Sequence, residues 1–414
     1  MKHVFLPETI EDAQAWLRKR LAAQQPFAVR GANSRFHPQE IPPGPPFPKG
    51  GDEVATPEIL STAKLTRTNF FDPDDMVVGV EAGMTVAALQ ALLAEQGMVL
   101  PVNPWFAEST IGAAFACNDN GPNRLNMGGF RDCVIGIEYL NGNGERVHAG
   151  GKVVKNVSGY DLCRMQIGSL GGLGVITALN FKVIPQPVAP HGLYGRFPDS
   201  TWQQRVAELH SARIPVDWIQ AFAPAESGSM DWLLGIGFSG NAARQQRIER
   251  EIQTICRGDL QLVAAGETPL GLSFLPGTDR FTGWVPKLRQ LWKLPAQHLH
   301  LMTLLTTSAA LHPTHLESIR SEQTRMVVHP IGADLHCFLD SEDATTQREF
   351  IASLQPMLRQ MQAKLVLGNA ASAIGYSDLG EFAQPPGYAL VQRLKRHLDP
   401  AGVFHAPFYE QPST

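Results

Sequence analysis

The segment GSLGGLGVITALNFKVIP, from Gly168 to Pro185, constrains the fold more than any other part of the chain. It holds four glycines within seven residues, followed by an alternating run that is typical of a strand. Glycines at this density allow the backbone to approach another group closely. A Rossmann dinucleotide site needs G-x-G-x-x-G between a strand and a helix, then an acidic residue about 20 positions later. Here the glycines at 168, 171, 172 and 174 lead into a strand, which excludes that kind of site.

Two further loops rich in glycine or asparagine lie in the same half of the chain, RGANSR (30–35) and STIGAAFACNDNG (109–121). Backbone N–H groups in tight glycine loops form concave sites for phosphate oxygens without a helix dipole. Arg30 adds a cation that binds phosphate strongly beside the first loop. Any one of these loops alone is typical of an ordinary turn. Three of them beside predicted strands favour a common site for a nucleotide.

The composition of the 414 residues is that of a soluble globular protein, with 43% hydrophobic and 18% charged residues and a net charge of −4. The length favours two or three domains. The absence of a basic block argues against a nucleic-acid partner, and no apolar run reaches the roughly 18 residues of a membrane helix. The start, MKHVFLPETI, is too poor in apolar residues for a secretory signal, so we expect a cytoplasmic protein. Five scattered cysteines without a C-x-x-C pair predict no iron–sulfur or zinc site.

The middle of the chain, from 192 to 368, has a pattern of its own. The predicted order of elements is β-α-β-β-α-β, the split ferredoxin-like unit, and it occurs twice, from GLYGRF to LQLVA and from LHLMTLLT to KLVLG. We expect the two units to pair into one continuous antiparallel sheet. After them, PGYALVQRLKRHLDPAGVF predicts a helix that stops at Asp399-Pro400. Its predicted buried stripe comprises Tyr388, Val391, Leu394 and Leu398.

Several blocks of the first half resemble a known family. They are RGANSR, DPDDMVVGVEAGMTVAALQALLAEQGMVLPVNP, STIGAAFACNDNGPNRLNMGGFRDCVIG and GGKVVKNVSGYDLCRMQIGSLGGLGVITALNFKVIPQP, together with LKRHLDPAGVF near the C-terminus. The resemblance is to the FAD-binding domain of the PCMH, or vanillyl-alcohol oxidase-type, flavoproteins. Within that family the blocks are most similar to the FAD-binding small subunits of bacterial glycolate oxidases.

The resemblance implies an α+β fold with three parts. Residues 1–187 are expected to form a PCMH-type FAD-binding domain of two subdomains. Residues 188–385 are expected to form an α+β cap domain, with an antiparallel sheet built from the two ferredoxin-like units. Residues 386–414 are expected to return to the FAD domain.

The resemblance also implies a non-covalent FAD and the residues that bind it. The first loop would hold the FAD pyrophosphate, and the second would lie along the diphosphate and the flavin edge. The third loop, with the backbone that follows it, would contact the flavin or the adenosine. The residues assigned in this way are Arg30, Gly31, Asn33, Ser34, Thr110, Ile111, Gly112, Asn118, Gly168, Gly171, Val175 and Ile176.

The sequence departs from the family pattern at three places. Ala32 and Asn33 follow Gly31 where relatives have consecutive glycines, and Ala113 replaces a second glycine. The segment FHAPF stands where the family commonly has Asn-Pro-Gly. Asn accepts a positive φ better than most residues, so the first loop is compatible with FAD. His37 lies outside the position at which some relatives attach FAD covalently.

A catalytic base for a 2-hydroxy acid is not evident, and the best candidates are His329 and His336 in HPIGADLH. Their spacing resembles a metal-binding H-x6-H element of larger 2-hydroxy-acid dehydrogenases. The Glu-His pair that completes that element is absent from LGNAASAIGYSDLGEF, so we predict no metal. The sequence favours a structural role for both histidines at the ends of strands in the cap over a metal site or a catalytic base.

The predicted function is an FAD-binding oxidoreductase subunit of a glycolate oxidase-like complex. It would pass electrons from a small 2-hydroxy acid through flavin to an acceptor. The implied partners are a larger FAD-containing 2-hydroxy-acid dehydrogenase subunit and an iron–sulfur subunit, in a hetero-oligomer that is cytoplasmic or peripheral to the inner membrane through its partners. The alternative is a non-catalytic assembly or electron-relay subunit of the same complex, with weak FAD binding or none.

Overall fold

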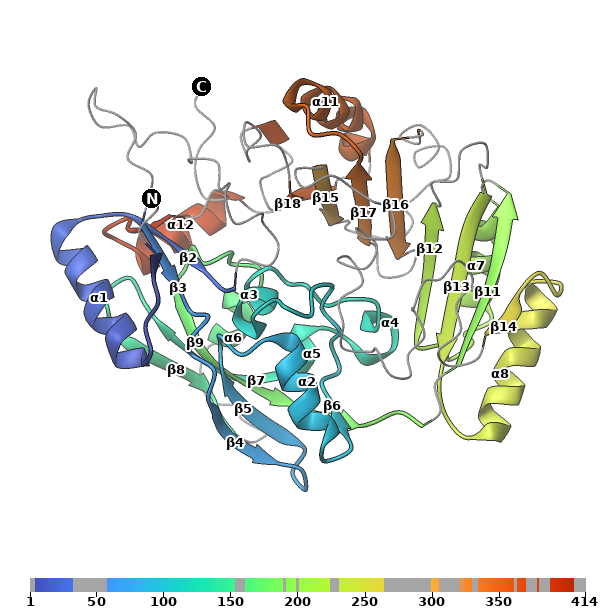
Figure 1. Ribbon diagram of the computed structural model, residues 1–414, viewed down its shortest axis with the longest axis horizontal. Helices are drawn as coiled ribbons and strands as arrows, with labels where there is room; N and C mark the ends of the chain where they lie inside the picture. The colour runs from blue at the N-terminus through green and yellow to red at the C-terminus, as the bar shows by residue number, and fades with distance from the viewer. Residues whose placement is uncertain are drawn as a thin grey trace. The chain divides into compact units, whose positions relative to one another are not determined.

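The structure is a computed structural model of the chain (Figure 1). It describes residues 4–32, 58–152, 161–188, 191–198, 201–223, 231–263, 299–304, 321, 323–329, 334–360, 363–369, 378–379 and 388–405. The chain divides into two compact units, which we treat separately. Unit 1 comprises Met1–Asn120, Gly128–Gln186 and Gln384–Thr414, and unit 2 comprises Gly121–Met127 and Pro187–Ala383.

Unit 1 begins with a small parallel sheet in the order β1-β3-β2-β19. Its strands are Val4–Phe5, Glu58–Ser61, Phe27–Arg30 and Phe404–His405. Helix α1 (Ile10–Ala23) starts at a capping box between Thr9 and Asp12. It buries Ala13 and Leu17 in the same apolar cluster as Phe27 and Leu60. The first and last strands described in the chain therefore belong to one sheet.

The second sheet of unit 1 is antiparallel, in the order β4-β5-β9-β7-β8. Its strands are Thr68–Asp72, Val77–Glu81, Val175–Lys182, Val134–Leu140 and Arg146–Gly150. Strands β7 and β8 form a hairpin, with the N–H of Asn143 donating to Asn141 Oδ1 in the turn. The strand expected after the third glycine loop is confirmed, as β9. Helix α2 (Val86–Ala94) has Thr85 as its N-cap and buries Val86, Leu89 and Leu93.

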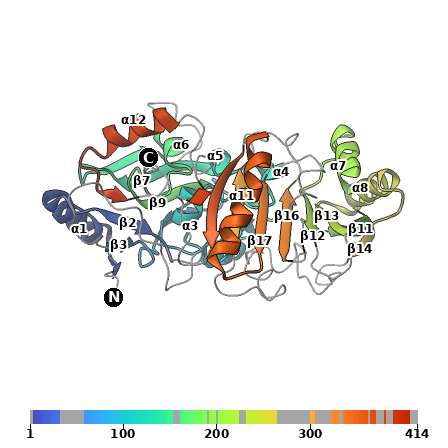
Figure 2. The ribbon, with the colours of Figure 1, turned by 90° about the horizontal axis from the view of Figure 1, so that it is seen from above.

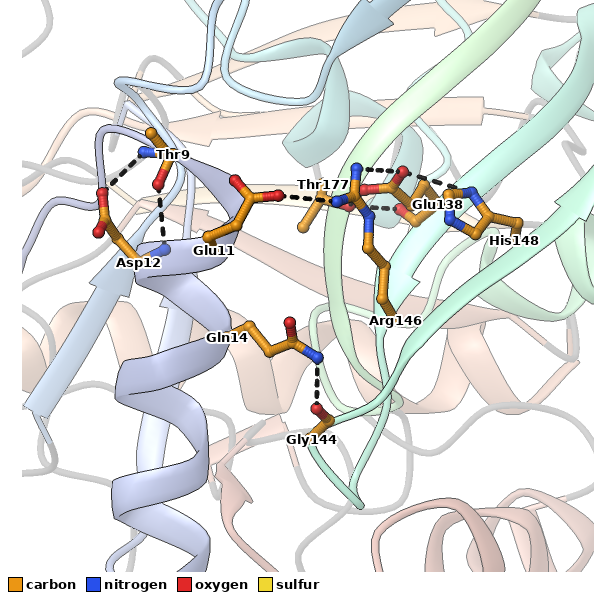
Figure 3. A network of polar contacts seen from close by, with 9 residues as sticks. All are labelled: Thr9, Glu11, Asp12, Gln14, Glu138, Gly144, Arg146, His148 and Thr177. Carbon is orange, nitrogen blue, oxygen red and sulfur yellow. Dashed lines mark hydrogen bonds and ion pairs between the residues drawn. The ribbon is translucent and has the colours of Figure 1, made fainter.

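A polar network ties α1 to this antiparallel sheet (Figure 3). The buried carboxylate of Glu138 on β7 accepts hydrogen bonds from Thr177 Oγ1 at 2.7 Å and from Arg146 Nη2 at 2.8 Å. Arg146 also reaches Glu11 on α1 at 3.0 Å. These carboxylates, and above all the hydrogen bond to Glu138, raise the pKa of Arg146. Because the network joins α1 to β7 and β8, it fixes the two sheets of unit 1 to each other.

Unit 2 is built on an eight-stranded antiparallel sheet in the order β14-β11-β13-β12-β16-β17-β15-β18. Strands β12 and β16 pair at Ala221 and Val328 and join the two halves of the sheet. The strand order of the second half is that of the first half in reverse. The strands are β11 (His191–Pro198), β12 (Trp218–Ala223), β13 (Asp231–Phe238), β14 (Gln261–Val263), β15 (Leu299–Leu304), β16 (Thr324–His329), β17 (Asp334–Leu339) and β18 (Lys364–Asn369).

One face of this sheet packs against helices, and Figure 2 shows α7 and α8 beside the first half and α11 beside the second. The helices span Thr201–Ser211, Ala242–Ile255 and Ala344–Gln360. Apolar side chains at helical spacing are buried between these helices and the sheet, such as Trp202 and Val206 on α7 and Ile248 and Ile252 on α8. The first helix of the second predicted unit, in HPTHLESI (312–319), lies outside the described residues. Among the described residues, no helix is both long enough and apolar enough to span a membrane.

The short helix α4 (Arg124–Met127) corrects the expected division of the chain, because we predicted an unbroken first domain over 1–187. The structure assigns Gly121–Met127 to unit 2. Leu125 packs against the apolar cluster of that unit, and Asn126 Nδ2 donates to Asp217 Oδ1 at 2.9 Å. Because of these contacts, residues 121–127 belong to unit 2, although the residues on both sides of them in the sequence belong to unit 1.

Candidate functional site

The first glycine loop begins where β2 ends, at Arg30 and Gly31. The carbonyl oxygen of Arg30 accepts from the N–H of Thr62 at 2.9 Å, and that of Gly31 accepts from Ser61 Oγ at 3.0 Å. The loop is therefore fixed against the end of the neighbouring strand β3. Burial lowers the pKa of Arg30 to about 10, which leaves the guanidinium charged at neutral pH. Asn33, Ser34 and His37 lie outside the described residues.

The second loop contains Thr110, the N-cap of helix α3 (Ile111–Ala116), whose Oγ1 accepts from the N–H of Ala113 at 3.3 Å. The N–H of Ile111 donates to Met84 O at 2.8 Å, and that of Gly112 donates to Ala82 O at 2.9 Å. Both groups are occupied inside the protein, so they cannot donate to a phosphate. These two hydrogen bonds hold the start of α3 against Ala82 and Met84, which follow β5.

The third loop uses glycine for its backbone conformation. Gly168 and Gly171 have φ values of 73° and 77°, which favour glycine. The N–H of Gly168 donates to Phe115 O at 3.3 Å, and that of Leu170 donates to Ala116 O at 2.9 Å. The loop therefore packs on the end of α3.

The three loops converge, and missing side chains make this possible. A Cβ at Gly31 would lie 2.1 Å from Thr110 Oγ1 and 3.0 Å from the Cβ of Ala113. A Cβ at Gly171 would lie 3.1 Å from the Cβ of Val29 on β2. The first loop thus touches the second, the second touches the third, and the third touches the strand that carries the first. The described residues among those predicted on the three loops lie together in unit 1.

Asn118 closes the second loop with a positive φ of 54°. Asn120 Nδ2 holds this conformation by donating to the carbonyl and the side-chain oxygen of Asn118, both at 3.0 Å. Asn120 Oδ1 accepts from the N–H of Phe130 at 2.7 Å. Asn120 is therefore a positioning residue that our sequence reasoning missed, although the run CNDNG contains it.

Val175 and Ile176 begin β9, where they pair with Leu140 and Tyr139 of β7. Their side chains are buried in two separate apolar clusters and do not face a ligand. On the other side of β9, the described pairing with β5 extends only as far as Ala178. Any contact of Val175 or Ile176 with a cofactor therefore uses the backbone.

The two histidines of the cap lie in unit 2, on β16 and β17. Both are buried, and their ring centroids are 6.4 Å apart. Gln220 Nε2, on β12, lies 3.0 Å from His329 Nε2. Burial, together with the charge of Arg124, lowers the pKa of His329 to about 3, so the ring is neutral at physiological pH. Our sequence reasoning missed Gln220, because only the β12–β16 pairing brings it to His329.

A metal centre at these histidines would need further ligands. Within the part of the chain that the structure describes, no three His, Cys, Asp or Glu side chains lie together in a way that could hold a metal ion. One neighbour of His329 is the side-chain amide of Gln220, which is a poor metal ligand compared with histidine or carboxylate.

The glycine-loop site in unit 1 fits a dinucleotide cofactor such as FAD. No Cβ could be accommodated at Gly31, where it would lie 2.1 Å from Thr110 Oγ1, and the half-buried guanidinium of Arg30 supplies positive charge beside this contact. Backbone N–H groups of the second loop (Ile111, Gly112) and of the third loop (Gly168, Ser169, Leu170, Gly172) are used within the protein, so a diphosphate would need donors from elsewhere in the site.

Residues 1–150 match a family model described as FAD binding domain. The glycolate oxidase subunit GlcE of Escherichia coli (strain K12) is 34% identical over 154 residues, covering 37% of this chain and 44% of the relative. The D-lactate dehydrogenase of Archaeoglobus fulgidus is 34% identical over 185 residues, covering 44% of this chain and 39% of the relative. The glycolate oxidase subunit GlcD of Bacillus subtilis (strain 168) is 32% identical over 145 residues, covering 34% and 31%. The chain thus spans less than half the length of these curated relatives.

A solved structure described as alkyldihydroxyacetonephosphate synthase matches with a TM-score of 0.67 and 15% identity, covering 97% of this chain and 76% of that chain. At this identity the match shows the fold alone. The matches together confirm the expected resemblance and the expected cofactor, FAD: the first part of this chain carries an FAD-binding domain, and its relatives include glycolate oxidase subunits and D-lactate dehydrogenases.

Proposed function

We propose that the chain is the FAD-binding oxidoreductase subunit of a glycolate oxidase-like complex that oxidises a small 2-hydroxy acid. The observation that carries the proposal is the convergence of three loops around Gly31, Thr110 and Gly171 in the unit that matches the FAD-binding domain. The names of the relatives support the substrate class, since they include glycolate oxidase subunits and D-lactate dehydrogenases.

In this proposal the chain's own residues bind and orient the cofactor. Arg30 neutralises phosphate charge, and the backbone of the first loop donates hydrogen bonds to the diphosphate. The backbone at Val175 and Ile176 lies along the ring system. Bound FAD supplies the hydride chemistry, and the protein supplies the orientation.

The residues that would meet the substrate belong to unit 2. His329 and His336 are our candidates, with Gln220 holding the ring of His329. For either imidazole to accept the hydroxyl proton of a 2-hydroxy acid, its pKa would have to be raised when substrate binds, since burial lowers the pKa of His329 to about 3. We propose no metal in this step.

A second candidate function is an assembly or electron-relay subunit of the same complex, with weak FAD binding or none. It is favoured by the occupied N–H groups of Ile111 and Gly112, which remove two donors from the second loop. The same complex would contain a larger FAD-containing subunit and an iron–sulfur subunit. It would be cytoplasmic or peripheral to the inner membrane through those partners.

The absorption spectrum of the purified chain separates these functions first. Flavin bands support the first function, and a colourless protein that fails to bind added FAD overturns it. If flavin is bound, anaerobic addition of glycolate or D-lactate to the chain alone follows. Bleaching supports catalysis in this chain, whereas bleaching that requires the larger subunit supports the relay. Affinity purification from cells that express all candidate subunits tests the complex itself.

A further inference from the structure

Helix α12 (Tyr388–Leu398) and strand β19 belong to unit 1, although they lie more than 200 positions along the sequence from residues 1–150, which match the FAD-binding domain. Val391, Leu394 and Leu398 of the expected stripe are half-buried, whereas the side chain of Tyr388 lies outside what the structure describes. Val391 and Leu398 pack with Leu173 of the third glycine loop. The helix therefore lies against one of the three loops of the candidate FAD site.

The ammonium group of Lys395 connects this helix to two parts of that site. Lys395 Nζ donates to Gly172 O of the third loop at 2.8 Å and to Phe404 O of β19 at 2.7 Å. Its third partner is Asp399 Oδ2 at 2.5 Å. An ammonium group has three protons, so these partners use its whole hydrogen-bonding capacity.

Asp399 is fully buried and completes the arrangement. Its Oδ1 accepts from the N–H of Val403 and its Oδ2 from the N–H of Phe404, both at 3.0 Å. A carboxylate with these partners fixes the turn between α12 and β19. Strand β19 in turn pairs in parallel with β2, whose end carries Arg30 and Gly31.

From these contacts we infer that Lys395 is a positioning residue for FAD, a role that rests on the proposed function. It connects the third loop, through Gly172, to the strand beside β2, and so sets the distance between the first and third loops. A buried pair of this kind is costly to break, because the remaining charge loses its partners. Small displacements of groups that hold a ligand lower affinity strongly.

The test compares Lys395→Met with Lys64→Met in the full chain. Lys64 forms an exposed ion pair with Glu8 in the same unit, so it serves as a matched control. FAD binding is measured by quenching of flavin fluorescence, at a temperature where circular dichroism shows both apoproteins folded. We expect the Kd for FAD to rise by about tenfold or more for Lys395→Met and to stay within twofold for Lys64→Met. An unchanged Kd for Lys395→Met overturns the inference.

Hydrogen exchange of the apoprotein provides a second measurement that does not need FAD. In Lys395→Met, peptides covering residues 168–174 are expected to exchange faster, whereas those of α2 keep their wild-type rates. Equal protection of the third loop in both proteins also overturns the inference. If Lys395→Met does not fold, Asp399→Asn takes its place in both measurements. A wild-type chain that binds no FAD contradicts the proposed function, while the exchange result still decides whether Lys395 holds the loop.

Discussion

The glycine-loop site of unit 1 differs in its chemical groups from the cluster of buried residues around His329 and His336 in unit 2. In unit 1 the important groups are backbone atoms, and the side chains that matter most are those that are missing, at Gly31 and Gly171. In unit 2 they are buried side chains, Gln220, His329 and His336, on three strands of one sheet. Under the proposed function, cofactor binding would depend on space and backbone conformation, whereas proton transfer would depend on side-chain identity.

The largest effect is expected for Gly31→Ala. The new Cβ would lie 2.1 Å from Thr110 Oγ1, so either the first loop or the start of α3 must move. Overpacking of this kind costs about 3 kcal/mol, which corresponds to a rise in the Kd for FAD of roughly 100-fold. Equilibrium titration with FAD measures this. Gly97→Ala is the control: its φ of 64° makes alanine strained there, but a Cβ would meet nothing within 4 Å, so the variant loses stability without crowding the first loop. Equal affinities in the two variants would show that space at the first loop is unimportant.

The reverse pattern is expected for His329→Leu. The variant should bind FAD as well as the wild type, but reduction of the flavin by a 2-hydroxy acid should slow by about 100-fold, because a proton acceptor is lost. Stopped-flow absorbance of the bound flavin measures the rate. Unchanged reduction would assign His329 a structural role only and would end the contrast between the two regions.

Glu138→Ala tests whether the frame of unit 1 is separate from its site. Removing this buried carboxylate leaves Thr177 and Arg146 without a shared acceptor, and we expect the free energy of unfolding to fall by about 2 kcal/mol. Chemical denaturation measures the loss, and the Kd for FAD of the folded variant should stay close to the wild-type value. His148→Ala is the control, because His148 is largely exposed. A greater loss in the control would contradict the network in Figure 3.

The smallest effect concerns pH and the buried His329. Its pKa is about 3 in the folded chain and near 6.5 in the unfolded chain, so the unfolded state binds more protons between these values. Stability from this group is complete above pH 6.5 and declines as the pH falls, by up to about 1.4 kcal/mol per pH unit. Denaturation curves between pH 7 and pH 5 should show this slope in the wild type and a shallower slope in His329→Leu. Parallel slopes would mean that the pKa of His329 is the same in the folded and unfolded chains.

The glycine loops could be predicted from sequence because their composition is itself the structural requirement. Gly168 and Gly171 adopt positive φ, and the strand after them follows the alternation of apolar residues. The occupied N–H groups of Ile111 and Gly112 could not be predicted in this way, since nothing local indicates where a backbone donor will point.

Contacts between residues that are far apart in the sequence could not be predicted from the sequence. Gln220 and His329 are 109 positions apart and meet only through the register of β12 with β16. Helix α4 has four residues and no apolar periodicity, so no local pattern in the sequence indicates that it belongs to unit 2. Lys395 and Asp399 have the spacing of an ordinary surface ion pair on a helix, and burial against the third loop gives them a different character.

The parallel pairing of β2 with β19 has a consequence for how the protein is made. Phe27 emerges early from the ribosome, whereas its partner Phe404 is among the last residues that the structure describes. At synthesis rates of about 5–20 residues per second, the first strand waits tens of seconds for its neighbour. During that time the first loop lacks part of its support, while the eight strands of unit 2 can already be assembled. The first loop therefore gains its full support within unit 1 only after β19 has been translated.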